Sequence, residues 1–190
     1  MRWLVFALIL ALSQVFAACS WFEDDAEYQT TFRRNLPLAK EGNAAAQYNI
    51  GTLYYEGLGV DDNFDEALTW FRRSADQGYA RAQSRLGYIY ADGDEVSQDY
   101  ALAVKWFRRA ADQGHAKAQY NLGTLYSNGL GVPQDFGMAY LWLNLAASRL
   151  VDEDERELAA DERDDVAEEM SPTRLAEAQR LAAEWTPSTP

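Results

Sequence analysis

A 36-residue repeat begins with the stretch Ala46-Gln47-Tyr48-Asn49-Ile50-Gly51-Thr52-Leu53-Tyr54-Tyr55-Glu56-Gly57-Leu58-Gly59-Val60 and returns at 82–96 and 118–132 without a gap. Identical residues occupy matching positions of the three copies: Ala46, Ala82 and Ala118; Gln47, Gln83 and Gln119; Gly51, Gly87 and Gly123; Tyr54, Tyr90 and Tyr126; Trp70, Trp106 and Trp142. A fixed period of this length is typical of a stacked array, in which each unit covers its neighbour's apolar face.

Each copy contains two helical patterns. In the first copy, Ala46, Ile50 and Leu53 lie three and four residues apart, which places them on one face of a helix A over about 43–56. Glycines end that helix, and Asn63 is a good N-cap for a helix B. The fold class is therefore predicted to be all-α, a solenoid of helix-turn-helix repeats. The same pattern predicts further helices over 79–92, 99–113, 115–128 and 135–148.

Segments outside the repeats are expected to cap the array, because a terminal repeat lacks a neighbour. Pro37 is expected to kink or divide the helix ahead of the repeats, and Ser171-Pro172 predicts the start of the last helix. The expected organisation is a signal peptide over 1–18, a tether over 19–27, a capping helix over 28–41, repeats over 42–77, 78–113 and 114–149, capping helices over 150–185 and a disordered tail over 186–190.

The beginning of the chain has the features of an export signal. Arg2 precedes an apolar run over residues 3–12, and small residues lead up to Cys19, the only cysteine. The run is shorter than the roughly 20 apolar residues of a membrane-spanning helix. Membrane association is therefore expected only through an attached lipid.

Phe16-Ala17-Ala18-Cys19 resembles the lipobox of bacterial lipoproteins. The resemblance implies that Cys19 is lipidated and, with Ser20 after it, that the chain is anchored to the outer membrane and faces the periplasm. Phe16 stands where Leu, Val or Ile is usual, so plain secretion after Val15-Phe16-Ala17 is the alternative.

Charge limits the class of partner. The formal net charge of −13 argues against nucleic acid, whose phosphates attract clustered Lys and Arg. Eleven acidic and two basic residues lie between Asp152 and Glu169. We expect this segment to be a helix with a solvated face, with a docking surface for a basic partner as the alternative. No metal or cofactor is expected, because Cys19 is alone and the acidic loop 92–95 lacks the register of an EF-hand.

The repeated residues, together with Ala67-x-x-Trp70-Phe71, resemble the Sel-one-like repeat (SLR) family, a branch related to the tetratricopeptide repeat. Residues 170–182 also resemble the end segment of many bacterial members. The resemblance implies a right-handed superhelix of helix pairs and a role in assembling other proteins. A cysteine-rich subgroup is linked to penicillin binding, but this chain lacks the disulfide of each repeat that marks that subgroup.

Several conspicuous side chains have a structural interpretation. One tryptophan per repeat could form a binding ladder, but packing explains the period better, so Trp70, Trp106 and Trp142 are predicted to lie in the core. The pairs Arg72-Arg73 and Arg108-Arg109 are expected to face the negative ends of the helix B dipoles.

Two further positions depart from the repeat. His115 is expected at the surface without a partner, since Asn43 and Tyr79 take its place in the other copies. Glu95 replaces the glycine found at Gly59 and Gly131, so its turn is either strained by a positive φ or built differently.

The predicted binding groove consists of helix A positions that do not face helix B, because helices A line the concave surface of tetratricopeptide-like arrays. Its tyrosines offer large contact area, and two cations could pair with a partner's carboxylates. The predicted groove residues are Tyr48, Thr52, Tyr55, Arg81, Ser84, Tyr88, Lys117, Tyr120 and Thr124.

No catalytic motif occurs, neither Gly-x-Ser-x-Gly nor Ser-x-x-Lys nor a phosphate-binding loop, so no catalytic residue is assigned. The leading hypothesis is a non-enzymatic adaptor of a bacterial envelope that binds a protein or peptide. The alternatives are a scaffold for cell-wall or exported polysaccharide and a wall-active or β-lactam-binding enzyme.

Overall fold

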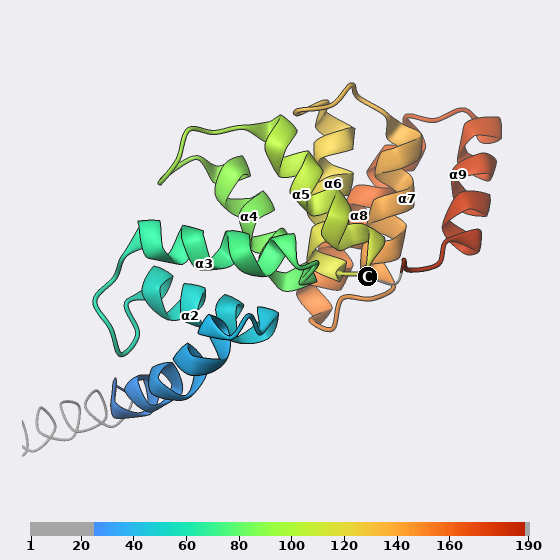
Figure 1. Cartoon of the computed structure of the whole chain (residues 1–190). Helices are drawn as coiled ribbons and strands as arrows, with labels where there is room; N and C mark the ends of the chain where they lie inside the picture. Colours follow the sequence, from blue (N-terminus) through green and yellow to red (C-terminus); the bar gives the residue numbers. More distant parts are fainter. Residues whose placement is uncertain (1–24, 189–190) are drawn as a thin grey trace, which may run out of the picture. The chain divides into compact units, whose positions relative to one another are not determined.

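The computed structural model describes residues 25–188, and every regular element in that range is an α-helix (Figure 1). The expected all-α solenoid of helix-turn-helix repeats is confirmed. The chain separates into two compact units, unit 1 ending at Trp70 and unit 2 beginning at Phe71. The export signal, Cys19 and the last two residues lie outside the described range.

The first helix covers residues 25–40 within the described range. The later helices are α2 (Ala44–Glu56), α3 (Phe64–Asp76), α4 (Ala80–Asp92), α5 (Tyr100–Asp112), α6 (Ala116–Asn128), α7 (Phe136–Ala147), α8 (Glu153–Glu168) and α9 (Pro172–Glu184). Helices α2, α4 and α6 are the helices A of the three repeats, and α3, α5 and α7 are the helices B.

Local capping explains where these helices begin and end. Asn43 and Asp99 accept hydrogen bonds from backbone N–H groups in the first turns of α2 and α5. The helices A end at Gly57, Gly93 and Gly129, each with a positive φ that suits glycine. The helix boundaries expected from the repeat therefore agree with the structure to within about one residue at each end.

Unit 1 packs the first helix against α2 and the start of α3. Its core consists of Ala39, Ala46, Ile50, Leu53 and Trp70. One boundary differs from expectation, and of the kink or division expected at Pro37 the division does not occur. Residues 25–27, expected as the end of a tether, are helical, and the helix continues through Pro37 without being divided.

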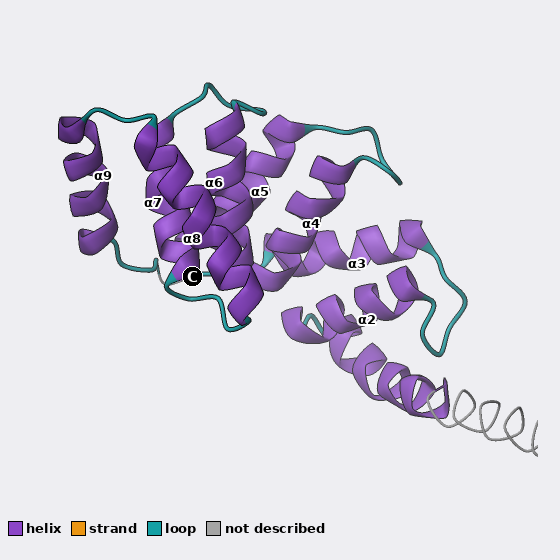
Figure 2. Ribbon diagram, turned by 180° about the vertical axis from the view of Figure 1, so that it is seen from behind, coloured by secondary structure: helices purple, strands orange, loops and turns teal. Residues whose placement is uncertain are grey.

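Unit 2 contains α4 to α7 as successive antiparallel helices, and α8 and α9 both pack against α7 (Figure 2). Glycines permit the close approach of helix A to helix B. A Cβ on Gly87 would lie 2.6 Å from the Phe107 ring, and one on Gly123 would lie 2.7 Å from Leu143. The repeated glutamine has a matching role, because Gln119 is fully buried and donates to the Ala111 carbonyl oxygen at the end of α5.

The turn at Glu95 is built without strain. No residue other than glycine has a positive φ within residues 25–188. Gly131 needs its glycine for a second reason, because a Cβ there would lie 2.3 Å from the Tyr100 carbonyl carbon. Glu95 therefore adopts a different turn from the one at Gly131.

Ser188, which lies in the tail expected to be disordered over 186–190, contacts the end of α5. The backbone N–H of Ser188 donates to the Asp112 carbonyl oxygen over 2.7 Å. Ahead of it, the rings of Trp185 and Trp142 pack edge to face with their centroids 6.2 Å apart. The tail thus contacts the end of α5 after α9 has covered α7.

Candidate functional site

Six of the nine predicted groove residues lie in unit 2, three on α4 and three on α6. The side of α4 and α6 that carries these six residues is called the inner face of unit 2. Arg81 and Tyr88 on α4 are exposed, and Ser84 between them is partly buried. The three residues on α6 are Lys117, Tyr120 and Thr124. They share the spacing of the α4 set, so each set lies along one side of its helix.

The α6 set is occupied by side chains of α8. Lys117 Nζ lies 2.6 Å from Glu155 Oε1. Tyr120 donates its hydroxyl proton to Glu162 Oε1, and Thr124 donates to Glu162 Oε2 over 2.8 Å. The acidic helix therefore turns two carboxylates toward the face that was predicted to receive a partner.

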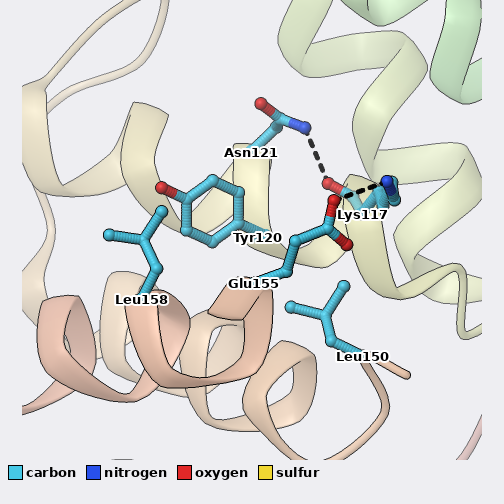
Figure 3. Close-up of a pocket in the computed structure, with 6 residues that line it drawn as sticks. All are labelled: Lys117, Tyr120, Asn121, Leu150, Glu155 and Leu158. Atoms are coloured by element: carbon cyan, nitrogen blue, oxygen red, sulfur yellow. Dashed lines mark hydrogen bonds and ion pairs between the residues drawn. The ribbon is translucent and has the colours of Figure 1, made fainter. Parts of the chain in front are cut away.

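A small cavity lies where α6 meets α8. It has a volume of about 230 Å³ and is lined by Lys117, Tyr120, Asn121, Leu150, Glu155 and Leu158. Figure 3 shows Tyr120 and Leu158 facing each other at one end and Leu150 beside the Lys117–Glu155 pair at the other. The lining thus combines the Lys117 ammonium with apolar side chains, among them Leu158, which is 51% exposed.

Burial and hydrogen bonding keep Tyr120 protonated. Burial, followed by the hydrogen bond to Glu162 and the charge of that carboxylate, raises the pKa of Tyr120 to about 12. The hydroxyl consequently acts as a hydrogen-bond donor toward Glu162 throughout the physiological pH range.

His115 has a partner, contrary to expectation. It is the N-cap of α6, and its Nδ1 accepts a hydrogen bond from the Ala118 backbone N–H over 3.3 Å. Burial lowers the pKa of His115, and the charges of Arg81 and Lys117 lower it further. An unprotonated Nδ1 is what this cap requires, and the two cations show that positive charge gathers at this end of the inner face.

The three remaining predicted groove residues, Tyr48, Thr52 and Tyr55, lie on α2 in unit 1. Thr52 donates its hydroxyl to the Tyr48 carbonyl oxygen, and the Tyr55 ring packs against Phe64 of α3 at 6.1 Å between centroids. Ala45 stands at the position that holds Arg81 in α4, so the α2 set lacks a cation.

The described residues offer no support for metal binding or membrane crossing. Over residues 25–188, no three His, Cys, Asp or Glu side chains gather closely enough to hold a metal ion. In the same part of the chain, the helices lack the length and apolar character that a membrane span requires.

The repeated part of the chain matches a known protein family. The model of a family described as Sel1 repeat matches residues 44–79, 80–115 and 116–149, more than half of the chain. This chain belongs to the Sel1 repeat family. Sel1 repeat proteins generally act as protein-interaction scaffolds and have no catalytic machinery in the repeat itself.

Two solved structures with the Sel1 repeat fold resemble the chain. A Sel1 repeat protein from Oxalobacter formigenes is 36% identical with a TM-score of 0.62, covering 68% of this chain and 96% of that one. A protective antigen of uropathogenic Escherichia coli with an SLR fold is 30% identical with a TM-score of 0.62, covering 79% of this chain and 36% of the antigen.

A curated relative is a putative Sel1-like repeat-containing protein of Acanthamoeba polyphaga mimivirus. It is 39% identical over 62 residues, which is 28% of this chain. The match spans only 11% of the length of the viral protein.

The repeated tryptophans of this Sel1 repeat array lie in the core, as predicted. Trp70, Trp106 and Trp142 are 7%, 8% and 2% exposed. The arginines do more than face helix dipoles, because the Arg108 guanidinium lies 5.0 Å from the centre of a Trp142 ring and also donates to the Tyr126 hydroxyl. Arg72 donates to Tyr90 in the equivalent way, so arginine and tyrosine link α3 to α4 and α5 to α6.

The occupation of the α6 set by α8 was missed at the level of sequence. A signal for it was present, since Lys117 and Thr124 are seven residues apart and so are Glu155 and Glu162. Many other acidic pairs in 152–169 have that spacing too. Only the packing of α8 against α7 selects the pair that reaches α6.

Proposed function

We propose that this protein is a non-enzymatic adaptor that binds a protein or peptide on the inner face of unit 2, mainly at α4. The observation that supports it is the contrast between two equivalent sets of side chains. Lys117, Tyr120 and Thr124 are engaged by α8, whereas Arg81 and Tyr88 are exposed. Exposed aromatic and cationic side chains are enriched in protein recognition sites, and Sel1 repeats act as scaffolds.

We further propose that the protein is exported and attached by a lipid on Cys19 to the outer membrane. The support is the order of Arg2, the apolar run and Cys19 in the sequence. Membrane fractionation of Cys19→Ala tests the anchor, with loss of the variant from the membrane fraction as the expected result. Equal membrane retention of variant and wild type would refute lipidation.

Site-specific photo-crosslinking in the native cell tests the binding face. A photoreactive residue in place of Tyr88 is expected to trap a discrete protein, because this side chain is half exposed on α4. The matched control is the same residue in place of Lys105, an exposed position on α5. Identical products from both positions, or none from position 88, would refute the assignment of the inner face.

A further inference from the structure

Two hollows lie along the seam between α6 and α8, where side chains of the two helices meet. The first is the cavity of about 230 Å³ at one end of the seam, and the second has a volume of about 280 Å³. The lining of the second includes Thr124, Ser127 and Asn128 from α6 and Glu162, Asp165 and Glu169 from α8.

A shift of seven residues relates the two hollows. All five residues of α6 and α8 that line the first have a counterpart seven positions later in the lining of the second, as Lys117 has Thr124 and Glu155 has Glu162. The contacts of Lys117 with Glu155 and of Thr124 with Glu162 both join residues 38 apart, so α8 runs parallel to α6. Seven residues are two helical turns, so the hollows lie about 10 Å apart along both helices.

The two hollows differ in chemistry. The first has an apolar wall that includes Leu150, the Tyr120 ring and Leu158, and the Leu158 side chain is 51% exposed. A leucine this exposed beside a cavity leaves apolar surface in water, which a further apolar side chain can cover. At the second hollow Asp165 takes the place of Leu158, so the wall carries charge where the first is apolar.

The carboxylates of the second hollow are not neutralised by the chain. Arg163, the base nearest to them in sequence, pairs with Asp164 over 2.7 Å. Asp165 and Glu169 are both exposed, and no cation of residues 25–188 forms an ion pair with either carboxylate. They stand one helical turn apart, where like charges repel each other. A cation placed between them would therefore be favoured.

We propose that the seam between α6 and α8 binds a basic helical segment of a partner protein, with an aliphatic side chain at Leu158 and a lysine or arginine between Asp165 and Glu169. Two side chains seven residues apart on a helix share one face and lie about 10 Å apart, which matches the two hollows. The site is preorganised, because Ala159 and Val166 hold α8 against α7. The seam contains none of the α4 positions of the proposed function, so the inference goes beyond that function.

Charge around the seam favours a basic segment over an acidic one. Asp154 and Asp161 stand four residues before and three residues after Leu158, so they share its side of α8, and both are exposed. The ammonium of Lys117 at the first hollow is compensated by Glu155, whose Oε1 lies 2.6 Å from it. The field of α8 therefore attracts a cationic segment, and the attraction weakens as salt is added.

The test uses designed peptides and the full chain labelled with 15N. The probe is a helical Ala/Gln peptide with one leucine and an arginine seven residues before and seven after it, so that either direction of binding brings a cation to Asp165. One control peptide has glutamates in place of the arginines, and another has its arginines five residues from the leucine, on a different face. NMR titration at low salt is expected to shift backbone signals of α6 and α8 with the probe. Each control is expected to bind about 10-fold more weakly or worse.

Variants of the chain locate the contact. Asp165→Asn combined with Glu169→Gln is expected to weaken binding of the probe about 10-fold, because both carboxylates lose their charge. The matched control is Glu153→Gln combined with Glu157→Gln. It removes the same charge from positions of α8 that line neither hollow, and it is expected to leave binding nearly unchanged.

Three results would overturn the proposal: equal binding of the probe and either control peptide, equal weakening by the two double variants, or signal shifts away from the seam. Sedimentation of the chain alone tests a second copy as the occupant. A concentration-dependent dimer that Asp165→Asn with Glu169→Gln abolishes would assign the seam to self-association and overturn the proposal as well. Failure here is distinct from failure of the proposed function, because crosslinking at position 88 reports on α4 alone.

Discussion

A double-mutant cycle on Tyr120 and Glu162 measures how strongly α8 engages the inner face. Tyr120→Phe removes the hydroxyl that donates to Glu162, and Glu162→Ala removes the acceptor. A hydrogen bond to a charged group contributes about 1.5–3 kcal/mol net, and partial exposure of Tyr120 reduces that figure because water replaces the lost partner. We therefore expect a coupling free energy of about 1 kcal/mol.

Urea unfolding followed by tryptophan fluorescence provides the four free energies of the cycle. The matched control is the cycle of Tyr88→Phe with Glu162→Ala, since Tyr88 lies on α4 and makes no hydrogen bond to Glu162. Its coupling is expected to fall within the roughly 0.3–0.5 kcal/mol of ordinary additivity. If the two cycles have the same coupling, the contact between Tyr120 and Glu162 does not exist in solution.

Three further predictions concern stability. Trp142→Ala is expected to destabilise the protein by about 3–5 kcal/mol in urea unfolding, because this side chain is fully buried between Arg108 and Trp185; a loss below about 1 kcal/mol would contradict its core position. The pKa of Tyr120 is raised from 10.0 to about 12, so its contribution to stability is complete below pH 10 and is lost as the pH rises toward 12. Alkaline unfolding curves should therefore be flatter for Tyr120→Phe than for wild type, and identical curves would refute the shift. The pKa of His115 is lowered from 6.5, so its contribution is present above that pH and is lost as the pH falls through the lowered folded-state value. His115→Asn keeps a capping side chain and should remove this acid sensitivity, while His115→Ala should cost about 1 kcal/mol at neutral pH.

The fold was predictable because its determinants are local and repeated. Asn43 and Asp99 cap their helices with their own side chains, and Gly57 ends α2 through its own φ. The burial of Trp106 followed from its period, since a residue that returns in every unit serves the contact between units.

Three positions show where the sequence alone was insufficient. His115 is the N-cap of α6. Its imidazole can fill this role, but its sequence context did not predict it. Ser188 donates to the carbonyl oxygen of Asp112, 76 residues away, which no local pattern indicates. Pro37 remains inside a helix that packs against the core of unit 1. The cap at His115 is a local contact with Ala118, whereas the contact of Ser188 joins segments far apart in the chain.

The sequence alone determined the repeat, the helix boundaries and the buried tryptophans, and it predicted a set of helix A positions for binding. It could do so because helix periodicity and capping act over a few residues, and each of these signals occurs in all three copies of the repeat. Only the tertiary structure decided which of those positions are already filled. Glu155 and Glu162 reach α6 because Val166 and Ala159 pack α8 against α7. That contact joins segments 38 residues apart, whereas Arg81 and Tyr88 on α4 stay exposed.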